Sequence, residues 1–460
     1  MTESYGIISC IPIVTMLALV FKTKRLFESV LVSCAIALII SDGTGFVTAL
    51  IDHIYKVLAN DTYAWILLML LLFGGLIRLL EESGGTLGFG KLALKYIKTE
   101  KRSLLVTWVL GIIIFIDDYL NNLAIGSAMR GISDKYKIPR EMTALTINAT
   151  GGPVCVLLPF STWAVFIFGT MQESGMPMAA DATVLTEYVK VIPYIFFAIV
   201  MVLAVPLLAI GVIPKFGPLK KAYERARSEG GSVFPDGLTQ PIEEAGESDD
   251  AGTEKQEPQL RDFLIPMLLV IGLTVYTSDL IFGVLAGIFS AFLLYIPTKK
   301  MTSSVFFDHL FEGMKDMLYI GVFIAFAFIF VESVNHLGFS DFVIESISPY
   351  LVGGMIPVIT FIAIAAMCFF GIDFWGIMIL TFPIIIPLSL QFEINAYLSV
   401  GAIVSGSVFG GMACFFSEQM LMSSTSCEIR PNDQAICLFP YAILVCIVSA
   451  VMYLIAGFVL

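Results

Sequence analysis

Long apolar runs separated by short polar segments dominate the chain. Uncharged stretches of about 18 or more residues recur, for example from 191 to 213, and each is long enough to cross the roughly 30 Å hydrocarbon core of a bilayer as a helix. The runs are continuously apolar and do not alternate in hydrophobicity, as the strands of a membrane barrel would. The pattern predicts an all-α polytopic membrane protein with roughly 10–13 membrane segments in the cell membrane.

Composition agrees with this prediction. Of the 460 residues 58% are hydrophobic and only 14% are charged, whereas about 25% are charged in an ordinary soluble domain. The net charge of −12 argues against nucleic acid as a partner, although much of the acidity lies in one loop, at 243–250. The eight cysteines lie mostly inside apolar runs without metal-binding spacing, which is typical of small packing residues. The lipid bilayer is therefore the expected partner.

Positive charges predict which connections face the cytoplasm, because short loops that carry Lys and Arg resist translocation. Four basic clusters lie at 22–25, 91–102, 130–140 and 215–227, whereas the connections 172–188, 333–350 and 391–396 contain no Lys or Arg. The four clusters should be cytoplasmic, and the three connections should face outside.

The segment 103–129 begins and ends beside basic clusters on the same predicted side, but it is too short for two full crossings. We expect it to enter the membrane and turn back near residues 115–122. This turn places Asp117, Asp118, Asn121 and Asn122 at membrane depth, where broken backbone is tolerated only inside protein or beside a water-filled cavity.

The second half of the chain shows the same plan from the opposite face. Its segment 351–391 has Asp373 in the middle, as either a re-entrant turn or a full hairpin. Asp117 and Asp373 are 256 positions apart (373 − 117 = 256), and so are Ser161 and Ser417 (417 − 161 = 256). Together with the charge-derived topology, the common offset predicts two inverted-topology repeats with re-entrant or broken helices, an architecture that places the site near the midplane.

The resulting division has five parts. They are N-terminal scaffold spans (1–102), a first transport unit with its following span (103–213), a cytoplasmic polar linker (214–262), further scaffold spans (263–350), and a second transport unit with the final span (351–460). The linker is rich in Gly, Glu and Pro and is too polar to bury a core, so we expect it to be disordered, with its basic start anchoring the preceding span at the membrane surface.

Acids inside a membrane are functional candidates, because a carboxylate in hydrocarbon is costly unless it is paired, protonated or bound to a cation. Asp117 and Asp118 are the strongest, since two adjacent charges at a buried turn repel each other and a sodium ion or a proton would relieve the repulsion. The purely structural alternative is that one acid caps a half-helix while the other pairs with an arginine such as Arg130.

Neutral oxygens complete the candidate site, because a hard cation such as sodium takes them alongside one or two carboxylates. Asp117, Asp118 and Asn121 are the predicted sodium ligands. The other candidate residues for binding the ion or substrate are Asn122, Asn148, Thr150, Ser161, Asp373, Ser405, Ser417 and Glu418. Residues 151–153, a Gly pair before Pro, should interrupt a helix and free backbone carbonyls inside a span.

Two classes of enzyme are disfavoured. The three histidines are dispersed and form no zinc constellation, and no glycine-rich phosphate loop indicates direct use of ATP. We expect no enzyme activity and no resident cofactor, since sodium and protons would be transported species. A channel would conduct without countertransport, and the paired buried acids favour a carrier. Association into a homodimer is left open.

Several motifs resemble the NhaC family of sodium/proton antiporters. They are FIDDYLN at 115–121, GSAMR at 126–130, IPRE at 138–141 and PVC at 153–155, with SGSVFG at 405–410 and the serine pair 423–424 in the second half. The resemblance implies the helical fold of the wider ion transporter superfamily. After Gly410 the family usually shows an acid, a histidine and a cysteine, then a proline-containing turn and an aspartate. Here stand Gly411, Met412, Ala413, Phe415 and Glu418.

The leading hypothesis is a sodium/proton antiporter that exposes mid-membrane carboxylates alternately to the two faces. Because half of the usual polar site is missing, the alternative is a sodium- or proton-coupled transporter or exchanger of a small organic solute, such as an amino acid or a hydroxy or carboxylic acid.

Overall fold

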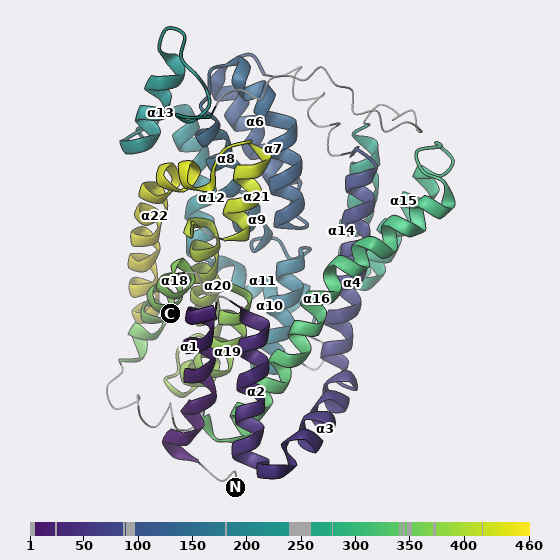
Figure 1. Ribbon diagram of the computed structural model, residues 1–460, viewed down its shortest axis with the longest axis vertical. Helices are drawn as coiled ribbons and strands as arrows, with labels where there is room; N and C mark the ends of the chain where they lie inside the picture. The colour runs from purple at the N-terminus through teal and green to yellow at the C-terminus, as the bar shows by residue number, and fades with distance from the viewer. Residues whose placement is uncertain are drawn as a thin grey trace.

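The computed structural model describes residues 5–23, 25–85, 88, 97–179, 182–238, 259–277, 279–339, 342, 346, 352–370, 374–415 and 417–460. These residues form helices joined by short connections, and no β-strand occurs among them (Figure 1). The main helices are α1 (Ile11–Thr23), α2 (Leu26–Asp42), α3 (Phe46–Leu58), α4 (Asp61–Glu82), α6 (Glu100–Ile113), α7 (Asp118–Lys135), α8 (Arg140–Asn148), α9 (Gly151–Cys155), α10 (Thr162–Glu173), α11 (Val189–Val191), α12 (Phe196–Ile210), α13 (Gly217–Arg227), α14 (Arg261–Thr277), α15 (Leu280–Tyr295), α16 (Ser303–His336), α18 (Ile356–Phe369), α19 (Phe374–Gln391), α20 (Ala396–Ala413), α21 (Glu418–Ser426) and α22 (Pro431–Val459). The prediction of an all-α polytopic membrane protein is confirmed.

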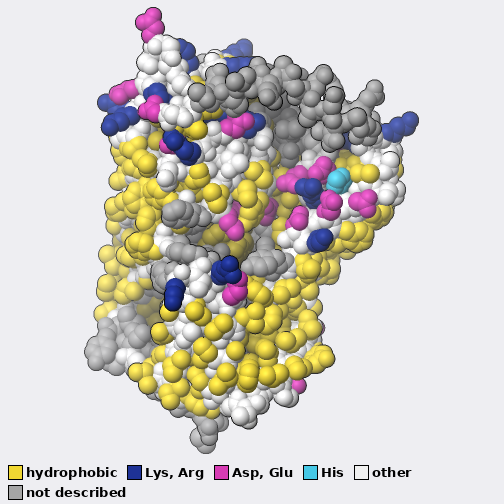
Figure 2. Space-filling view, viewed as in Figure 1, with side chains coloured by type: hydrophobic (Ala, Val, Ile, Leu, Met, Phe, Trp, Pro, Cys, Tyr) yellow, Lys and Arg dark blue, Asp and Glu magenta, His cyan; other side chains and the backbone are white. Residues whose placement is uncertain are grey.

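Within the described ranges, six helices are long and apolar enough to cross a membrane. They cover Phe27–Leu58, Tyr63–Glu82, Ser303–His336, Phe374–Gln391, Ala396–Ala413 and Pro431–Val459. A further pair, Val184–Tyr194 with Phe196–Ile210, is bent by 67° at its break. Figure 2 shows the apolar side chains as a broad surface, with most of the Lys and Arg side chains of this face in the upper part of the view. Such a distribution suits helices surrounded by lipid.

Helices α4 and α16 pack closely along one side of the molecule (Figure 1). Their backbones meet at two glycines: a Cβ added at Gly74 would lie 2.3 Å from the carbonyl oxygen of Gly313, and one added at Gly313 would lie 2.1 Å from that of Gly74. Small residues at a crossing allow this close approach, which supplies the van der Waals contact that holds membrane helices together. Helices α14 and α15 pack against each other, and α15 also contacts α4. We call α1–α4 with α14–α16 the α4–α16 bundle.

The remaining membrane helices, α6–α10, α12 and α18–α22, form a second group that we call the broken-helix bundle. Its two halves have matching helix limits: α6 and α18 cover 100–113 and 356–369, and α7 and α19 cover 118–135 and 374–391. Helix α8 begins at 140 and α20 at 396, while α10 begins at 162 and α21 at 418. Every one of these pairs is separated by the 256 positions found in the sequence. The inverted-repeat interpretation gains support from this agreement, because four helix starts follow one offset.

Ion pairs gather where three of the predicted cytoplasmic clusters meet. Lys215 and Arg227 both pair with Glu100 at the start of α6, with Nζ–Oε1 3.0 Å for the lysine, and Arg225 donates two hydrogen bonds of 2.8 and 2.9 Å to Glu141 on α8. The basic residues around 100, 140 and 215–227 therefore share one end of the molecule, as the charge pattern predicted.

The expectation of a disordered linker at 214–262 is wrong for its first part. Helix α13 buries Leu219, Ala222, Tyr223 and Ala226 on one face, and its arginines pair with acids of α6 and α8. The chain continues to Phe234, whose ring lies 3.9 Å from the Arg140 guanidinium carbon. Composition alone missed this helix because its stability comes from docking and not from an apolar core of its own. Residues 239–258 lie outside the described residues.

Candidate functional site

The first pair of broken helices meets at Asp117. Helix α6 ends at Ile113, and Asp117 has extended backbone angles (φ −150°, ψ 141°) before α7 begins at Asp118. The Asp117 Oδ1 atom accepts hydrogen bonds from the backbone N–H groups of Tyr119 (2.9 Å) and Leu120 (3.3 Å). Aspartate is a favoured N-cap residue, and its charge is stabilised by the positive end of the helix dipole. The break therefore falls where the sequence predicted a turn.

Both carboxylates are almost fully buried, with 4% of Asp117 and 2% of Asp118 exposed. Thr162 Oγ1 donates to Asp117 Oδ2 (3.1 Å), while Asp118 accepts from Trp163 Nε1 at Oδ1 (3.1 Å) and from Gln419 Nε2 at Oδ2 (2.9 Å). All of these donors are neutral. Within the described part of the chain, no Lys, Arg or His side chain forms an ion pair with either aspartate. Two adjacent carboxyl groups are thus held in the protein interior without a fixed countercharge.

The purely structural interpretation, in which one acid caps a half-helix and the other pairs with an arginine, holds only in part. Asp117 does cap α7, but Arg130 is not a partner of either acid. Instead its guanidinium pairs with Glu428 (Nη1–Oε1 3.0 Å) and donates to the Ser426 carbonyl oxygen (3.1 Å). Arg130 therefore does not neutralise either member of the buried pair.

Ser161 and Ser417 have the same local role in the two halves. Ser161 Oγ accepts from Ala164 N (3.1 Å) at the start of α10, and Ser417 Oγ accepts from Met420 N (3.2 Å) at the start of α21. Both hydroxyls also donate to a preceding backbone carbonyl. As N-caps they fix where each half-helix begins, and so position the side chains that follow.

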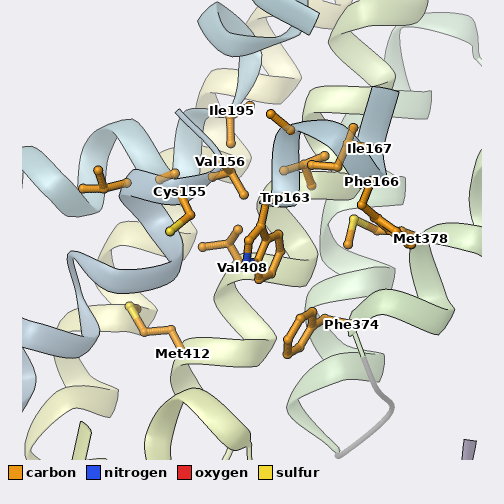
Figure 3. Packing of buried hydrophobic residues seen from close by; sticks show 14 of the residues in the cluster. Cys155, Val156, Trp163, Phe166, Ile167, Ile195, Phe374, Met378, Val408 and Met412 are labelled. Atoms are coloured by element: carbon orange, nitrogen blue, oxygen red, sulfur yellow. The ribbon is translucent and has the colours of Figure 1, made fainter. Parts of the chain in front are cut away.

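The N-termini of α7, α10 and α21 meet at the carboxylates, and that of α19 packs against the start of α10. Trp163 from the start of α10 stacks on Phe374 from the start of α19, with ring centroids 4.9 Å apart, and its ring centroid is 4.5 Å from that of Trp375. Figure 3 shows Trp163 among Phe374, Val408 and Phe166. Helix α21 contributes Gln419 and also Glu418, which accepts a hydrogen bond from the Tyr119 hydroxyl of α7. Asp373, predicted at the second turn, lies outside the described residues.

Three predicted amides are buried near this break. Asn121 Nδ2 donates to the carbonyl oxygens of Gly111 (2.8 Å) and Ile114 (2.6 Å), and Asn148 Nδ2 donates to that of Met412 (3.2 Å). The side-chain oxygens of Asn121, Asn122 and Asn148 have no hydrogen-bond partner in the described protein. Buried acceptors of this kind are rare without a partner, and amide oxygens are suitable ligands for a hard cation.

Two other predicted residues serve helix packing. Thr150 Oγ1, beyond the end of α8, donates to the carbonyl oxygens of Thr146 and Ile147 in that helix, both at 3.0 Å. Ser405 accepts from Tyr453 Oη (2.7 Å) and from Phe197 N (3.3 Å), and so joins α20 to α22 and α12. Neither hydroxyl takes part in the hydrogen bonds of the aspartates.

Sequence reasoning missed Tyr119, Thr162, Trp163 and Gln419 as residues of the site. A usable signal was present, because Thr162 and Trp163 correspond to Glu418 and Gln419 at the offset of 256. Among the described residues no group of three or more His, Cys, Asp and Glu side chains could hold a metal ion. A sodium ion would therefore have to use amide, hydroxyl or backbone oxygens beside the aspartates.

Comparison with known proteins supports the class that the fold and site define, a secondary transporter. Two solved structures share the fold, each at 13% identity and a TM-score of 0.62. The YdaH transporter of Alcanivorax borkumensis matches over 90% of this chain and 89% of its own. MtrF of Neisseria gonorrhoeae, described as illuminating a class of antimetabolite efflux pumps, matches over 91% and 85%.

One sequence family matches part of the chain. The family described as "Na+/H+ antiporter family" matches residues 260–458, so the resemblance seen in the sequence is confirmed over the second half of the chain. An uncharacterised protein of Haemophilus influenzae is 24% identical over 504 aligned positions, covering 99% of this chain and 92% of that protein.

Proposed function

We propose that the protein exchanges sodium for protons by alternating access at Asp117 and Asp118. The observation that carries this proposal is the pair of adjacent, buried carboxylates at a helix break, held by neutral donors and the positive ends of half-helices. Leaving both charged and unpaired would be costly, so a proton or a sodium ion is the natural partner. The match to the sodium/proton antiporter family supports the choice of ions.

Coupling between sodium and proton transport follows from competition of the two ions for the same carboxylates. Sodium requires ionised carboxylates, whereas protonation neutralises them, so one site cannot hold both partners at full occupancy. The broken-helix bundle would carry the site from one face to the other against the α4–α16 bundle, which is the rocking or gating of one unit against another that such folds use. Each ion would then be exchanged for the other across the membrane.

The test is proton flux from purified full-length protein in sealed liposomes with a pH dye inside. We expect flux when sodium or lithium is added outside, and none with potassium or choline. Asp117→Asn should abolish the flux without unfolding the protein, because asparagine also caps helices and only the charge is lost. Asp42→Asn, which changes an exposed aspartate at the end of α2, is the control and should keep normal flux. Normal exchange in the Asp117 variant would reject the proposal.

A second candidate is coupled transport or exchange of a small organic solute such as an amino acid or a hydroxy or carboxylic acid. The convergence of the N-termini of α7, α10 and α21 favours it, because positive half-helix ends are suited to anionic substrate groups. The fold shared with MtrF, described with efflux pumps, points the same way. In the liposome assay this function predicts no ion flux until the solute is added.

A further inference from the structure

A cavity of about 430 Å³ lies between the two bundles, away from the buried aspartates. Asp61 and Trp65 of α4 line one side, Thr274 of α14 and Asp279 before α15 line another, and Phe168 of α10 lines a third. Residues 182–185, from a connection predicted to face outside, also contribute. The cavity therefore opens on the predicted outer face.

Both charged side chains among the described residues that line the cavity are acidic. Asp61 and Asp279 are carboxylates, and among the described residues that line the cavity there is no Lys, Arg or His. Asp61 is the first residue of α4, and Asp279 caps α15 by accepting from the backbone N–H groups of Ile281 (2.9 Å) and Phe282 (3.3 Å). Acidic side chains suit the N-terminal ends of helices, where the helix dipole is positive.

The other walls suit an organic ligand. Trp65 and Phe168 make an edge contact with ring centroids 5.7 Å apart, and further apolar side chains surround them. Thr274 is fully buried, and its hydroxyl oxygen has no hydrogen-bond partner in the described protein. That oxygen lies against Gly283 of α15, where an added Cβ would come within 1.9 Å of it, so the aromatic and apolar side chains are the ones that offer contacts to a ligand.

The geometry points to a binding site for a small organic cation with an aromatic or apolar body, such as an amine. The two carboxylates attract its positive charge, the Trp65 ring gives a cation–π or stacking surface, and the apolar wall covers the rest of the molecule. The cavity reaches Pro159, two residues before the Ser161 cap of α10. An occupant would therefore sit between α4 and α10, beside the helix that carries Thr162 and Trp163 to the aspartates.

Calorimetric titration of the full-length protein in lipid nanodiscs, in potassium chloride, tests this site with three ligands that share a ring. Benzyltrimethylammonium has a permanent positive charge, benzyl alcohol is neutral and phenylacetate is negative. We expect saturable binding of the cation only. Equal binding of the neutral alcohol, or no binding of the cation, would overturn the inference, and this comparison needs no substitution.

A variant locates the bound cation. Asp61→Asn combined with Asp279→Asn removes both charges at nearly constant side-chain size, and asparagine can still cap α15 at position 279, so affinity for benzyltrimethylammonium should fall at least about tenfold. Asp52→Asn removes an exposed carboxylate of α3 that does not line the cavity and should leave affinity unchanged. Unchanged affinity in the double variant would place the cation elsewhere and reject this site.

Discussion

Gln419 Nε2 donates a 2.9 Å hydrogen bond to Asp118 Oδ2, which joins the start of α21 to the start of α7 across 301 positions of sequence. The donor stabilises the ionised carboxylate, which is the form that sodium requires. Gln419→Leu removes it at similar volume, and hydrogen bonds to charged groups contribute about 1.5–3 kcal/mol. We therefore expect the sodium concentration for half-maximal flux to rise at least about tenfold in liposomes.

A second buried glutamine provides the control for this change. Gln434 donates to Ser423 Oγ (2.7 Å) and to the Ala144 carbonyl oxygen (3.4 Å), without touching either aspartate. Gln434→Leu should lower thermal stability but leave sodium half-saturation close to normal. If both variants shifted half-saturation equally, the effect would be one of general packing and not of the bond to Asp118.

Trp163→Phe separates the hydrogen bond of Trp163 from its stacking. The indole N–H donates a hydrogen bond of 3.1 Å to Asp118 Oδ1, and the same ring stacks on Phe374. Phenylalanine keeps an aromatic ring but has no donor. We expect weaker apparent sodium affinity, measured as half-saturation of proton flux, with little loss of protein on purification.

Trp108→Phe is the matched control, because its indole also donates a hydrogen bond, to the Val202 carbonyl oxygen (2.9 Å), but outside the site. Flux that depends normally on sodium is expected in this variant. A Trp163 variant with native half-saturation would show that Asp118 does not need the indole donor.

The sequence could predict the helix break because an acid pair and two amides inside an apolar run leave few alternatives to a buried turn. It could also predict that Ser161 and Ser417 occupy matching positions, since the offset of 256 is a property of positions alone, but it assigned them to ion or substrate binding and not to the helix caps that they form. The partners of Asp118 could not be predicted, because Trp163 and Gln419 meet it only when α10 and α21 fold against α7. The packing role of Ser405 could not be predicted either. Helix α20 is apolar and buried on nearly all sides, so no periodic pattern indicates which way its hydroxyl groups face.

Gly152 allows Gln419 to reach Asp118. A Cβ added at Gly152 would lie 2.4 Å from Gln419 Nε2, which is too close, so the amide would have to move away from the carboxylate. Gly152→Ala should therefore reduce sodium-driven proton flux at least about tenfold, because the displaced Gln419 amide would no longer donate its hydrogen bond to Asp118. Initial rates in liposomes at matched protein density measure this loss.

Gly131 in α7 is the comparison, because nothing lies within 4 Å of a Cβ added there. Gly131→Ala should retain flux and, since alanine is the better helix former, stabilise the protein by at most about 1 kcal/mol. Wild-type rates in the Gly152 variant would mean that the position of Gln419 does not limit transport.

The last prediction concerns the docking of α13 on the cytoplasmic end of α6. Burial alone would raise the pKa of Glu100, but hydrogen bonds and charge from Lys215 and Arg227 outweigh burial and lower it below the usual value. A carboxyl with a lowered folded pKa stabilises the docked state above its unfolded pKa of about 4.3 and loses this contribution as the pH falls through the folded value. At neutral pH the contact should be fully formed.

Glu100→Gln should mimic that acidification at pH 7. Lys215 and Arg227 would lose their countercharge, α13 would detach more often, and limited proteolysis within 214–238 should become faster than in the unmodified protein. Glu224→Gln is the control, because Glu224 makes only an exposed pair with Lys220 at 3.8 Å. Equal cleavage rates for both variants at pH 7 would show that Glu100 does not hold α13 in place. A cleavage rate that rises in the unmodified protein only below about pH 4 would show that the ionised form of Glu100 holds α13 in place.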